Sequence, residues 1–362
     1  MLWVSSAAAS PTVNVKDHDA RGDGSTDDTA ALQAAVGAVA GTGGTVWVPS
    51  GVYMIDASRG VALQSQMTLR LESGAVLRAI PNALDHSFVV LVKGVESVNI
   101  TGGAIEGERL THRGTTGEWG NGIEIRNSKK ITIDRVSVRN CWGDGFYISN
   151  KSETIRVSHV LVDRNRRQGL TITSATDVIV SESVFRNTSG TAPESGIDVE
   201  PNQGETVANC QVVDCLFIAN AGGGLQVGVA QRHTGHAFVT GFLAEGNTFL
   251  KNGPNLPPTY TIQVAGCEGA IIRNNQLRGN QGIGIGVLNS AQTTVTGNTV
   301  QQTLLTSYKA DAGIFLRDST GTICTGNVVT HNNGYGIFLW NSETDVSGNE
   351  VTDNKWGQVK IR

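Results

Sequence analysis

Two acidic residues on one predicted strand are the clearest candidates for chemistry. In the segment Ser195-Gly-Ile-Asp-Val-Glu-Pro-Asn202, Asp198 and Glu200 stand two positions apart. Residues i and i+2 of a strand leave the same face, which predicts carboxylates roughly 7 Å apart. This separation is typical of inverting hydrolysis of a glycosidic bond, in which one carboxyl donates a proton and the other activates water. Like charges this close also raise the pKa of one of the two carboxyls, as a general acid requires. The alternative is that the two residues are an ordinary exposed charged pair on a strand surface.

The strand that carries this pair belongs to a repeat. The pattern is a glycine followed by apolar-x-apolar, and it begins at Gly122, Gly145, Gly169, Gly196, Gly224, Gly313 and Gly336. The first five glycines are 23 to 28 residues apart. A second run that alternates apolar with polar residues follows in many repeats, for example Ile131-Thr-Ile-Asp134, and this period is that of a strand with one buried face. Variable spacing around a constant strand is typical of stacked coils with loops.

Later repeats add an asparagine two residues before an apolar position. These are Asn247, Asn275, Asn298, Asn327 and Asn349. Stacked amides at one bend of each coil would satisfy the polar groups of a sharp corner. No sustained 3.6-residue apolar period follows residue 40, which excludes a helical solenoid. We predict an all-β fold, a single-stranded right-handed parallel β-helix with coils of about 22 to 24 residues and a short N-terminal capping helix.

In such a coil the x residue of each repeat points outward. The predicted outward column is Glu124, Tyr147, Thr171, Asp198, Gln226, Gln263, Gly284, Phe315 and Phe338. Rung stacking then places Gln226 and Thr171 on either side of Asp198, with Tyr147 two rungs away. The insertion at 231–236 follows the neighbouring strand and brings a cation or an imidazole toward the site. The residues predicted to contact substrate are Tyr147, Glu124, Arg126, Thr171, Gln226, Arg232, His233 and Trp119.

The N-terminal segment fits the same plan. Asp27-Asp28-Thr29 precedes an alanine-rich run, which predicts a capped helix around 27–38 that closes the end of the bore. Residues 1–12 are expected to be a disordered arm or the remnant of an export signal, and 13–362 a single β-helix domain.

Composition excludes several classes of protein. Of the 362 residues 45 are glycine, about one in eight, and 17% are charged. An average protein has about 7% glycine and about 25% charged residues. The net charge is -4 and no basic run exceeds Arg166-Arg167, which argues against a nucleic-acid partner. No apolar run reaches the roughly 18 residues of a membrane span. The five cysteines lack metal-like spacing and are expected to be buried, unbridged apolar residues.

Two segments near the N-terminus carry a family resemblance. Residues 15–36, which include Arg21-Gly-Asp-Gly-Ser-Thr-Asp-Asp28, and residues 43–53, Gly-Gly-Thr-Val-Trp-Val-Pro-Ser-Gly-Val-Tyr, resemble the start of the pectate-lyase-like β-helix superfamily. That superfamily includes pectate lyases, polygalacturonase-type hydrolases, alginate C5-epimerases and phage tailspikes. The resemblance implies a carbohydrate substrate but does not choose among these reactions. The aspartates of these segments are expected to be structural.

Two further segments bear on the reaction. The run Cys141-Trp-Gly-Asp-Gly-Phe-Tyr147 resembles the Asn-Thr-Asp-Gly segment of polygalacturonase-type hydrolases, which puts Asp144 at the place of a catalytic aspartate; a turn residue is the alternative. The double-Asp, Gly-His-Gly and Arg-Ile-Lys segments of that family are missing at matching coils. The run Gly196-Ile-Asp-Val-Glu200 resembles the epimerase segment Gly-Phe-Asp-Pro-His, but Glu200 stands where that family has histidine.

The resulting prediction is a glycoside hydrolase that acts on a polysaccharide or oligosaccharide, with Asp198, Glu200 and Asp144 as catalytic candidates. A polysaccharide lyase or uronan C5-epimerase is the first alternative, and a non-catalytic glycan-binding β-helix of tailspike type is the second. No cofactor is expected for a hydrolase, whereas a lyase would add Ca²⁺. Neither nucleic acid nor membrane is an expected partner, a homo-oligomer stays open, and a secreted or periplasmic location is predicted.

Overall fold

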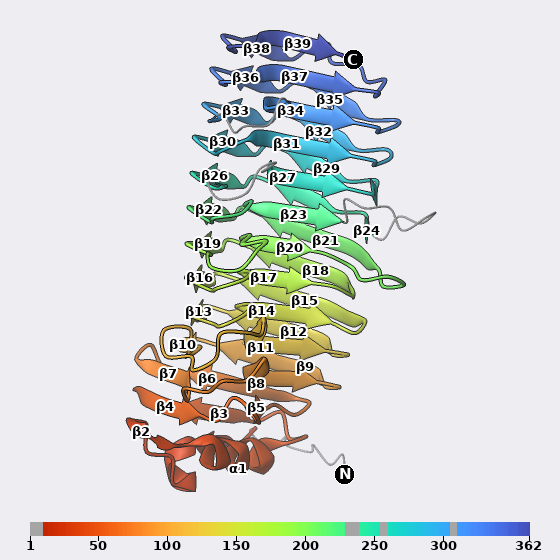
Figure 1. Ribbon diagram of the computed structural model, residues 1–362. Helices are drawn as coiled ribbons and strands as arrows, with labels where there is room; N and C mark the ends of the chain where they lie inside the picture. Colours follow the sequence, from red (N-terminus) through yellow and green to blue (C-terminus); the bar gives the residue numbers. More distant parts are fainter. Residues whose placement is uncertain (1–9, 229–238, 254–259, 305–309) are drawn as a thin grey trace, which may run out of the picture.

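The chain winds into a right-handed parallel β-helix built from three long parallel sheets. The computed structural model describes residues 10–228, 239–253, 260–304 and 310–362. Each coil contributes one strand to each sheet in turn, and the coils stack along one axis with the N-terminal helix at one end (Figure 1). The predicted fold class is therefore confirmed.

The third of these sheets carries the repeat strands, with Asp198 on one of them and Glu200 just beyond its end. Its strands in stacking order are β5 (Val61–Ala62), β8 (His86–Lys93), β11 (Trp119–Arg126), β14 (Phe146–Ser149), β17 (Leu170–Ile172), β20 (Ile197–Val199), β23 (Leu225–Gly228), β27 (Tyr260–Ala265), β31 (Ile283–Leu288), β34 (Ala312–Arg317), β37 (Tyr335–Trp340) and β39 (Gly357–Ile361).

The other two sheets complete the coil. The first sheet contains β1 (Thr12–Asn14), β3 (Thr45–Val48), β6 (Met67–Leu71), β9 (Glu96–Thr101), β12 (Lys129–Asp134), β15 (Ser152–Ser158), β18 (Ala175–Ser181), β21 (Val207–Val213), β25 (Leu243–Glu245), β29 (Ile271–Arg273), β32 (Thr294–Thr296) and β35 (Ile323–Thr325), with β24 (Val239–Thr240) and β28 (Cys267–Glu268) beside it. The second contains β2 (Asp23–Asp27), β4 (Gly51–Ile55), β7 (Ala75–Ala79), β10 (Ala104–Glu106), β13 (Ser137–Arg139), β16 (Leu161–Asp163), β19 (Val184–Arg186), β22 (Leu216–Ile218), β26 (Thr248–Leu250), β30 (Gln276–Arg278), β33 (Thr299–Gln301), β36 (Val328–Thr330) and β38 (Glu350–Thr352).

The glycine that opens each repeat is needed because neighbouring coils approach closely at that point. A Cβ on Gly145 would lie 2.5 Å from the carbonyl oxygen of Gly169, and a Cβ on Gly169 would lie 2.3 Å from that of Gly196. Neither glycine has a positive φ. The high glycine content at these positions therefore reflects lack of space rather than a left-handed backbone.

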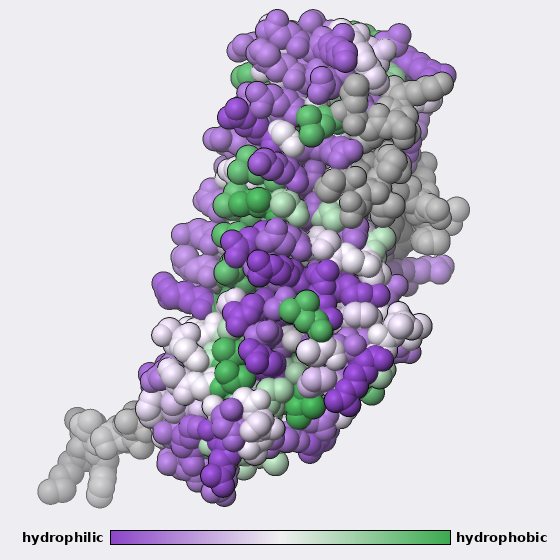
Figure 2. Space-filling model, turned by 60° about the vertical axis from the view of Figure 1, so that its left-hand side comes forward, coloured by the Kyte–Doolittle hydropathy of each residue, from purple (hydrophilic) through white to green (hydrophobic). Residues whose placement is uncertain are grey.

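The interior of the bore is filled by one continuous apolar core. Inward residues of the three sheets are buried, and Phe185, Phe217 and Phe249 form a stack on successive coils with ring centroids 5.4 and 4.6 Å apart. Figure 2 shows the outer surface on one side as largely hydrophilic, with hydrophobic residues in separate patches along the axis. All five cysteines are buried and free, as predicted.

The predicted asparagine ladder forms at one bend of the C-terminal coils. The Nδ2 of Asn275 donates to the Oδ1 of Asn298 at 2.9 Å, and Asn298 donates to Asn327 in the same way. The pattern extends to Asn247 at one end and Asn349 at the other. A second ladder that the sequence reading missed runs from Asn220 through Asn252 to Asn280. Each amide satisfies the backbone of its neighbour, so the bends of adjacent coils are locked in register.

Replacement of one ladder residue tests this role. Asn275→Ala removes the acceptor of both the backbone N–H and the Nδ2 of Asn247, and both donors are buried. At about 1–3 kcal/mol for each unsatisfied group, we expect the free energy of unfolding to fall by about 2–4 kcal/mol in urea titrations. The exposed neighbour Gln276→Ala is the control, with an expected change within about 0.5 kcal/mol. Equal stability of the two variants would contradict the ladder's role.

Helix α1 (Thr29–Val39) covers the N-terminal end of the bore, after a short 3-10 helix η1 (Val15–His18). Its buried residues, Leu32, Ala35, Val36 and Val39, join the main core. These are the only helices in the parts of the chain described above, and none of the described helices has the length and apolar character of a membrane span.

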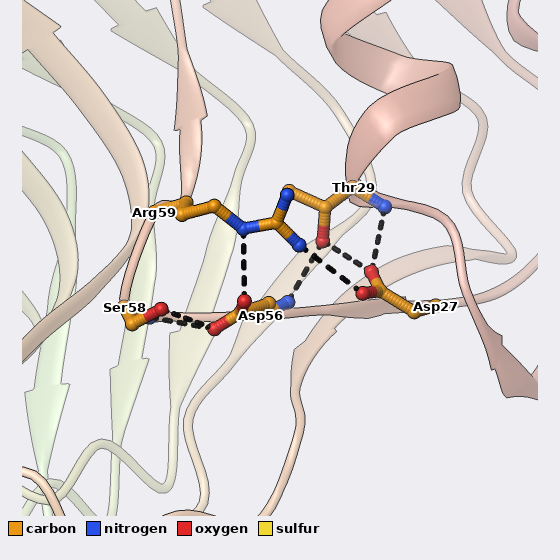
Figure 3. A network of polar contacts seen from close by, with 5 residues as sticks. All are labelled: Asp27, Thr29, Asp56, Ser58 and Arg59. Atoms are coloured by element: carbon orange, nitrogen blue, oxygen red, sulfur yellow. Dashed lines mark hydrogen bonds and ion pairs between the residues drawn. The ribbon is translucent and has the colours of Figure 1, made fainter.

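The aspartates before α1 have structural contacts. Asp27 Oδ1 accepts from the backbone N–H of Thr29 at 2.9 Å, and the Thr29 hydroxyl accepts from the backbone N–H of Asp56 at 2.8 Å. Arg59 binds Asp56 and Asp27, which ties the start of the helix to the turn after β4 (Figure 3). The N-cap residue Asp28 makes no side-chain cap bond. Its carboxylate instead accepts from the backbone N–H groups of Arg21 and Gly22.

Candidate active site

The outward column of the third sheet brings together residues from successive coils. Asp198 on β20 is in register with Thr171 on β17 and Gln226 on β23, the neighbours expected from the spacing. Thr171 in turn pairs with Tyr147 on β14. The column continues from Gln226 through Gln263.

One position of the predicted column is wrong. Gly286, and not Gly284, pairs with both Gln263 and Phe315. The segment Gly282-Ile-Gly-Ile-Gly286 repeats glycine at every second position, so the sequence pattern offers two registers. A Cβ on Gly286 would lie 2.3 Å from the Tyr260 ring, and this packing identifies the register that forms.

Asp198 is almost fully enclosed, with 2% of its surface exposed. The Nε2 of Gln168 donates to Asp198 Oδ2 at 2.7 Å, and the Oε1 of Gln168 accepts from the backbone N–H of Ser195 at 2.8 Å. Burial raises the pKa of Asp198 well above its usual value, and the nearby Glu200 carboxylate raises it further. Asp198 therefore holds its proton in a range where an ordinary aspartate is ionised.

Glu200 occupies a different environment from the one predicted. Strand β20 ends at Val199, so Glu200 lies just beyond the strand and is exposed. Its backbone N–H still donates to the Ile172 carbonyl at 2.9 Å, which keeps it against the neighbouring coil. The two acids thus differ in burial, since Asp198 is enclosed in the wall and Glu200 is in contact with water.

Asp144 lies in the turn before β14 and is fully buried. Its Oδ2 accepts from the Thr171 hydroxyl at 2.8 Å and from an Arg167 guanidinium nitrogen at 3.1 Å. Its Oδ1 is buried without a hydrogen-bond partner. Burial raises the pKa of Asp144 to about 6, although Arg167 and Thr171 oppose the shift.

The raised pKa of Asp144 predicts a dependence of stability on pH. Between the usual value of 3.8 and about 6, Asp144 binds more protons in the folded chain than in the unfolded chain, so its own contribution to the free energy of unfolding falls as pH rises through this range. A difference of about two pH units corresponds to about 3 kcal/mol. We expect Asp144→Asn to flatten this fall in urea titrations at pH 4 and pH 6.5, whereas an unchanged slope would exclude Asp144 as its source.

Arg167 and Gln168 were missed as site residues by the sequence reading. They lie in the turn before β17, next to each other, and each binds one of the two buried aspartates. The side chain of Arg167 is 14% exposed, and its Nε also lies 3.4 Å from Glu118 Oε2. The only sequence signal was the Arg166-Arg167 pair, which has no repeat equivalent.

A second polar cluster lies toward the N-terminal end of the column. Glu124 is 1% exposed, and its carboxylate binds the Arg126 Nε at 2.6 Å, the His86 Nε2 at 3.0 Å and the Asn121 Nδ2 at 2.8 Å. The Oδ1 of Asn121 accepts from the backbone N–H of Asp144 at 3.3 Å, which connects this cluster to the buried acid. His86 was also missed by the sequence reading.

The remaining predicted contact residues are spread along the column. Tyr147 is half-buried, with a pKa raised mainly by burial, and Gln226 is also half-buried. Thr171 is 1% exposed, and its hydroxyl donates a hydrogen bond to Asp144. Trp119, at the start of β11, is 49% exposed and in register with His86. Arg232 and His233 lie outside the described residues.

A groove runs along the turns that follow the third sheet. It has a volume of about 710 Å³ and is lined by cationic, amide, hydroxyl and carboxylate groups, including Lys93, Arg126, Lys151 and Glu205. Arg126 is common to this groove and the Glu124 cluster, so the groove borders the column. No group of three or more His, Cys, Asp or Glu side chains that suits a metal ion occurs in the described ranges.

Comparison of sequences finds two family matches. Residues 12–226 match the profile of the family "Rhamnogalacturonase A/epimerase, pectate lyase-like". Residues 227–361 match "Periplasmic copper-binding protein (NosD)". The boundary between the matches falls within the β-helix, just before β23 ends at Gly228.

Similar proteins include enzymes and binding proteins. The uncharacterized protein YclG of Bacillus subtilis is 27% identical, and the match covers 94% of this chain and 62% of YclG. The mannuronan C5-epimerase AlgE5 of Azotobacter vinelandii is 25% identical, and the match covers 96% of this chain and 36% of AlgE5. The chain thus spans about three fifths or less of these relatives. Among solved structures, the A-module of the Azotobacter vinelandii epimerase AlgE6 has a TM-score of 0.62 at 17% identity (96% and 99% coverage). The Streptococcus pneumoniae adhesin PfbA has 0.69 at 16% (97% and 93%), which shows a shared fold.

Proposed function

Because the chain belongs to the rhamnogalacturonase A/epimerase, pectate-lyase-like family, we propose that it is a carbohydrate-active enzyme that hydrolyses glycosidic bonds with inversion. The substrate is a polysaccharide or oligosaccharide that lies along the outward column of the third sheet. In this proposal Asp198 is the general acid and Glu200 is the general base. The relatives and fold neighbours named as epimerases, and a neighbour named as a catalytic α-1,3-glucanase unit from Streptomyces thermodiastaticus, support a carbohydrate substrate.

The observation that carries the proposal is the contrast between the two acids. Asp198 is buried with a raised pKa, whereas Glu200, two residues later, is exposed. An acid that stays protonated and a carboxylate in contact with water are the two groups that inverting hydrolysis requires. Because only 2% of Asp198 is accessible, the sugar oxygen that receives its proton must lie directly against strand β20.

The chemical step follows from these roles. Asp198 gives its proton to the glycosidic oxygen as the bond to the anomeric carbon breaks, and Glu200 takes a proton from the water that attacks this carbon from the opposite face. The products are a free alcohol and a sugar with inverted anomeric configuration. Asp198 and Glu200 then return to their initial states when a proton passes from Glu200 to Asp198 through solvent.

Product analysis tests the reaction type. The protein is incubated with a panel of neutral and uronic polysaccharides, with and without chelator, and reducing ends are counted while NMR follows the first anomer formed. New reducing ends with inverted configuration and no ultraviolet absorbance are the expected result. Retained configuration, or an unsaturated uronate that absorbs in the ultraviolet, would overturn inverting hydrolysis.

A lyase or a C5-epimerase is the second candidate, and Tyr147 is the observation in its favour. The phenol is half-buried in the same column, one rung from Glu124 and one from Thr171, and this candidate function assigns it the exchange of a proton with the sugar ring. An epimerase would change the uronate composition without cleaving the chain, and a Ca²⁺-dependent lyase would stop with chelator. Binding without any turnover would favour the third candidate, a glycan-binding β-helix.

We also propose a secreted or periplasmic location. The match to a family described as periplasmic and the likeness to a surface adhesin support it. Fractionation of the native host, with the protein detected outside the cytoplasm, is the corresponding measurement.

A further inference from the structure

The geometry points to Arg167 as a positioning residue of this site: we propose that its guanidinium holds Asp144 as a carboxylate behind the column and so leaves the transferable proton on Asp198. The inference rests on the proposed hydrolytic role of Asp198. It adds a site residue that was not predicted from the sequence. It also makes Asp144 the buried counter-ion of Arg167 in place of a catalytic residue.

Arg167 is fixed in the wall of the third sheet. Its backbone N–H donates to the Gly143 carbonyl at 3.1 Å, and one terminal guanidinium nitrogen lies 3.1 Å from Asp144 Oδ2. The same Oδ2 accepts from the Thr171 hydroxyl. Since Asp144 is 0% exposed, it cannot touch a substrate without a change of structure. Its contacts are those of a buried counter-ion.

The two buried aspartates differ in their donors. Asp144 has a charged partner in direct contact, and an arginine at this distance favours the ionised form. Asp198 has only the neutral amide of Gln168 in contact and the Glu200 carboxylate nearby. Arg167 acts on Asp198 and Glu200 through space, and Glu118 also faces the guanidinium. The carboxyl of Asp144 therefore loses its proton at a lower pH than the carboxyl of Asp198.

The neighbouring arginine provides a matched control. Arg166 donates to the carbonyls of Gly117 and Trp142, and its guanidinium lies 3.8 Å from the centroid of the Trp142 ring. No carboxylate ion pair of Arg166 is found among the described residues. It anchors the segment before β11 by packing, so its substitution disturbs local structure without removing a charge partner of Asp144.

The order of proton loss can be measured without a substrate. Carbon-13 NMR follows the carboxyl carbons of Asp144 and Asp198, assigned with Asp144→Asn and Asp198→Asn, across the pH range in the whole protein. In the unaltered chain we expect Asp144 to ionise at a lower pH than Asp198. Arg167→Gln should raise the titration midpoint of Asp144 by about 1–3 pH units, and that of Asp198 by less. Arg167→Lys and Arg166→Lys should leave both midpoints within about half a pH unit.

A double variant distinguishes the loss of the Arg167 charge from misfolding. Arg167→Gln leaves Asp144 without its counter-ion, so Asp144→Asn combined with Arg167→Gln removes both charges together and should restore the midpoint of Asp198. Two results would overturn the proposal: ionisation of Asp198 before Asp144, or an unchanged Asp144 midpoint in Arg167→Gln. If the titrations follow the expectation but no glycan is hydrolysed, the role of Arg167 stands and the proposed function fails.

Discussion

Asp198→Asn should lower kcat by about 10²–10⁴-fold, the usual contribution of a general acid. The substitution keeps the shape of the side chain and the contact with Gln168, whose amide can turn to accept as well as donate. It removes only the proton that leaves with the sugar oxygen. KM should change little, since the amide still fills the same position against the polymer, and the rate of reducing-end release is the measurement.

The control for this variant is an aspartate far from the column. Asp353 is exposed near the last coil, and Asp353→Asn should leave both kcat and the melting temperature unchanged. If Asp198→Asn retains full turnover, the acid lies elsewhere on the chain. If Asp198→Asn combined with Glu200→Gln is no slower than either single variant, the two acids act as one unit, as an acid and base of the same step should.

The fold was predictable because its cause is repeated along the chain. The same pattern recurs from coil to coil: a glycine at a point of close approach, two inward apolar residues and an outward x residue. An error in the assignment of one loop therefore does not change the predicted fold. Gly286 shows where this fails. Glycine at three alternate positions, 282, 284 and 286, gives two equivalent registers in the sequence, and they are distinguished by the packing of Tyr260 against Gly286 and of Gly284 against the Gly313 carbonyl.

The site was predictable only where it lies on the repeat itself. Asp198 replaces a neutral x residue and is visible from periodicity, and so are its neighbours Thr171 and Gln226. Arg167 and Gln168 lie in a turn whose length varies among coils, and a sequence pattern cannot tell which turn residues point back at the column. The burial of Glu124 was also missed, because it depends on contacts with His86 at the start of β8 and with Asn121, three residues earlier in β11.

Phe217→Ala should produce the largest loss of stability, about 3–5 kcal/mol. Phe217 is 0% exposed in the middle of the bore and lies between Phe185 and Phe249, with ring centroids 5.4 and 4.6 Å away. The coils above and below are held by their own backbone pairing, so they cannot collapse into the space that the ring leaves. Urea unfolding measures the change, with Leu110→Ala, a 79% exposed side chain, as the control.

The site of Phe217 makes the same variant a test of how the solenoid holds together. In a repeat protein each coil contacts only its neighbours, so a defect at Phe217 weakens the interfaces on both sides of one coil. Asp198 lies on the coil just before it, since β20 precedes β22 in the chain. We therefore expect Phe217→Ala to increase amide hydrogen exchange first in β22, in its partners β19 and β26 and in β20, and to lower activity at temperatures below the global melting point. Uniform exchange along the whole rod would contradict this local coupling and would show that the coils unfold as a single cooperative unit.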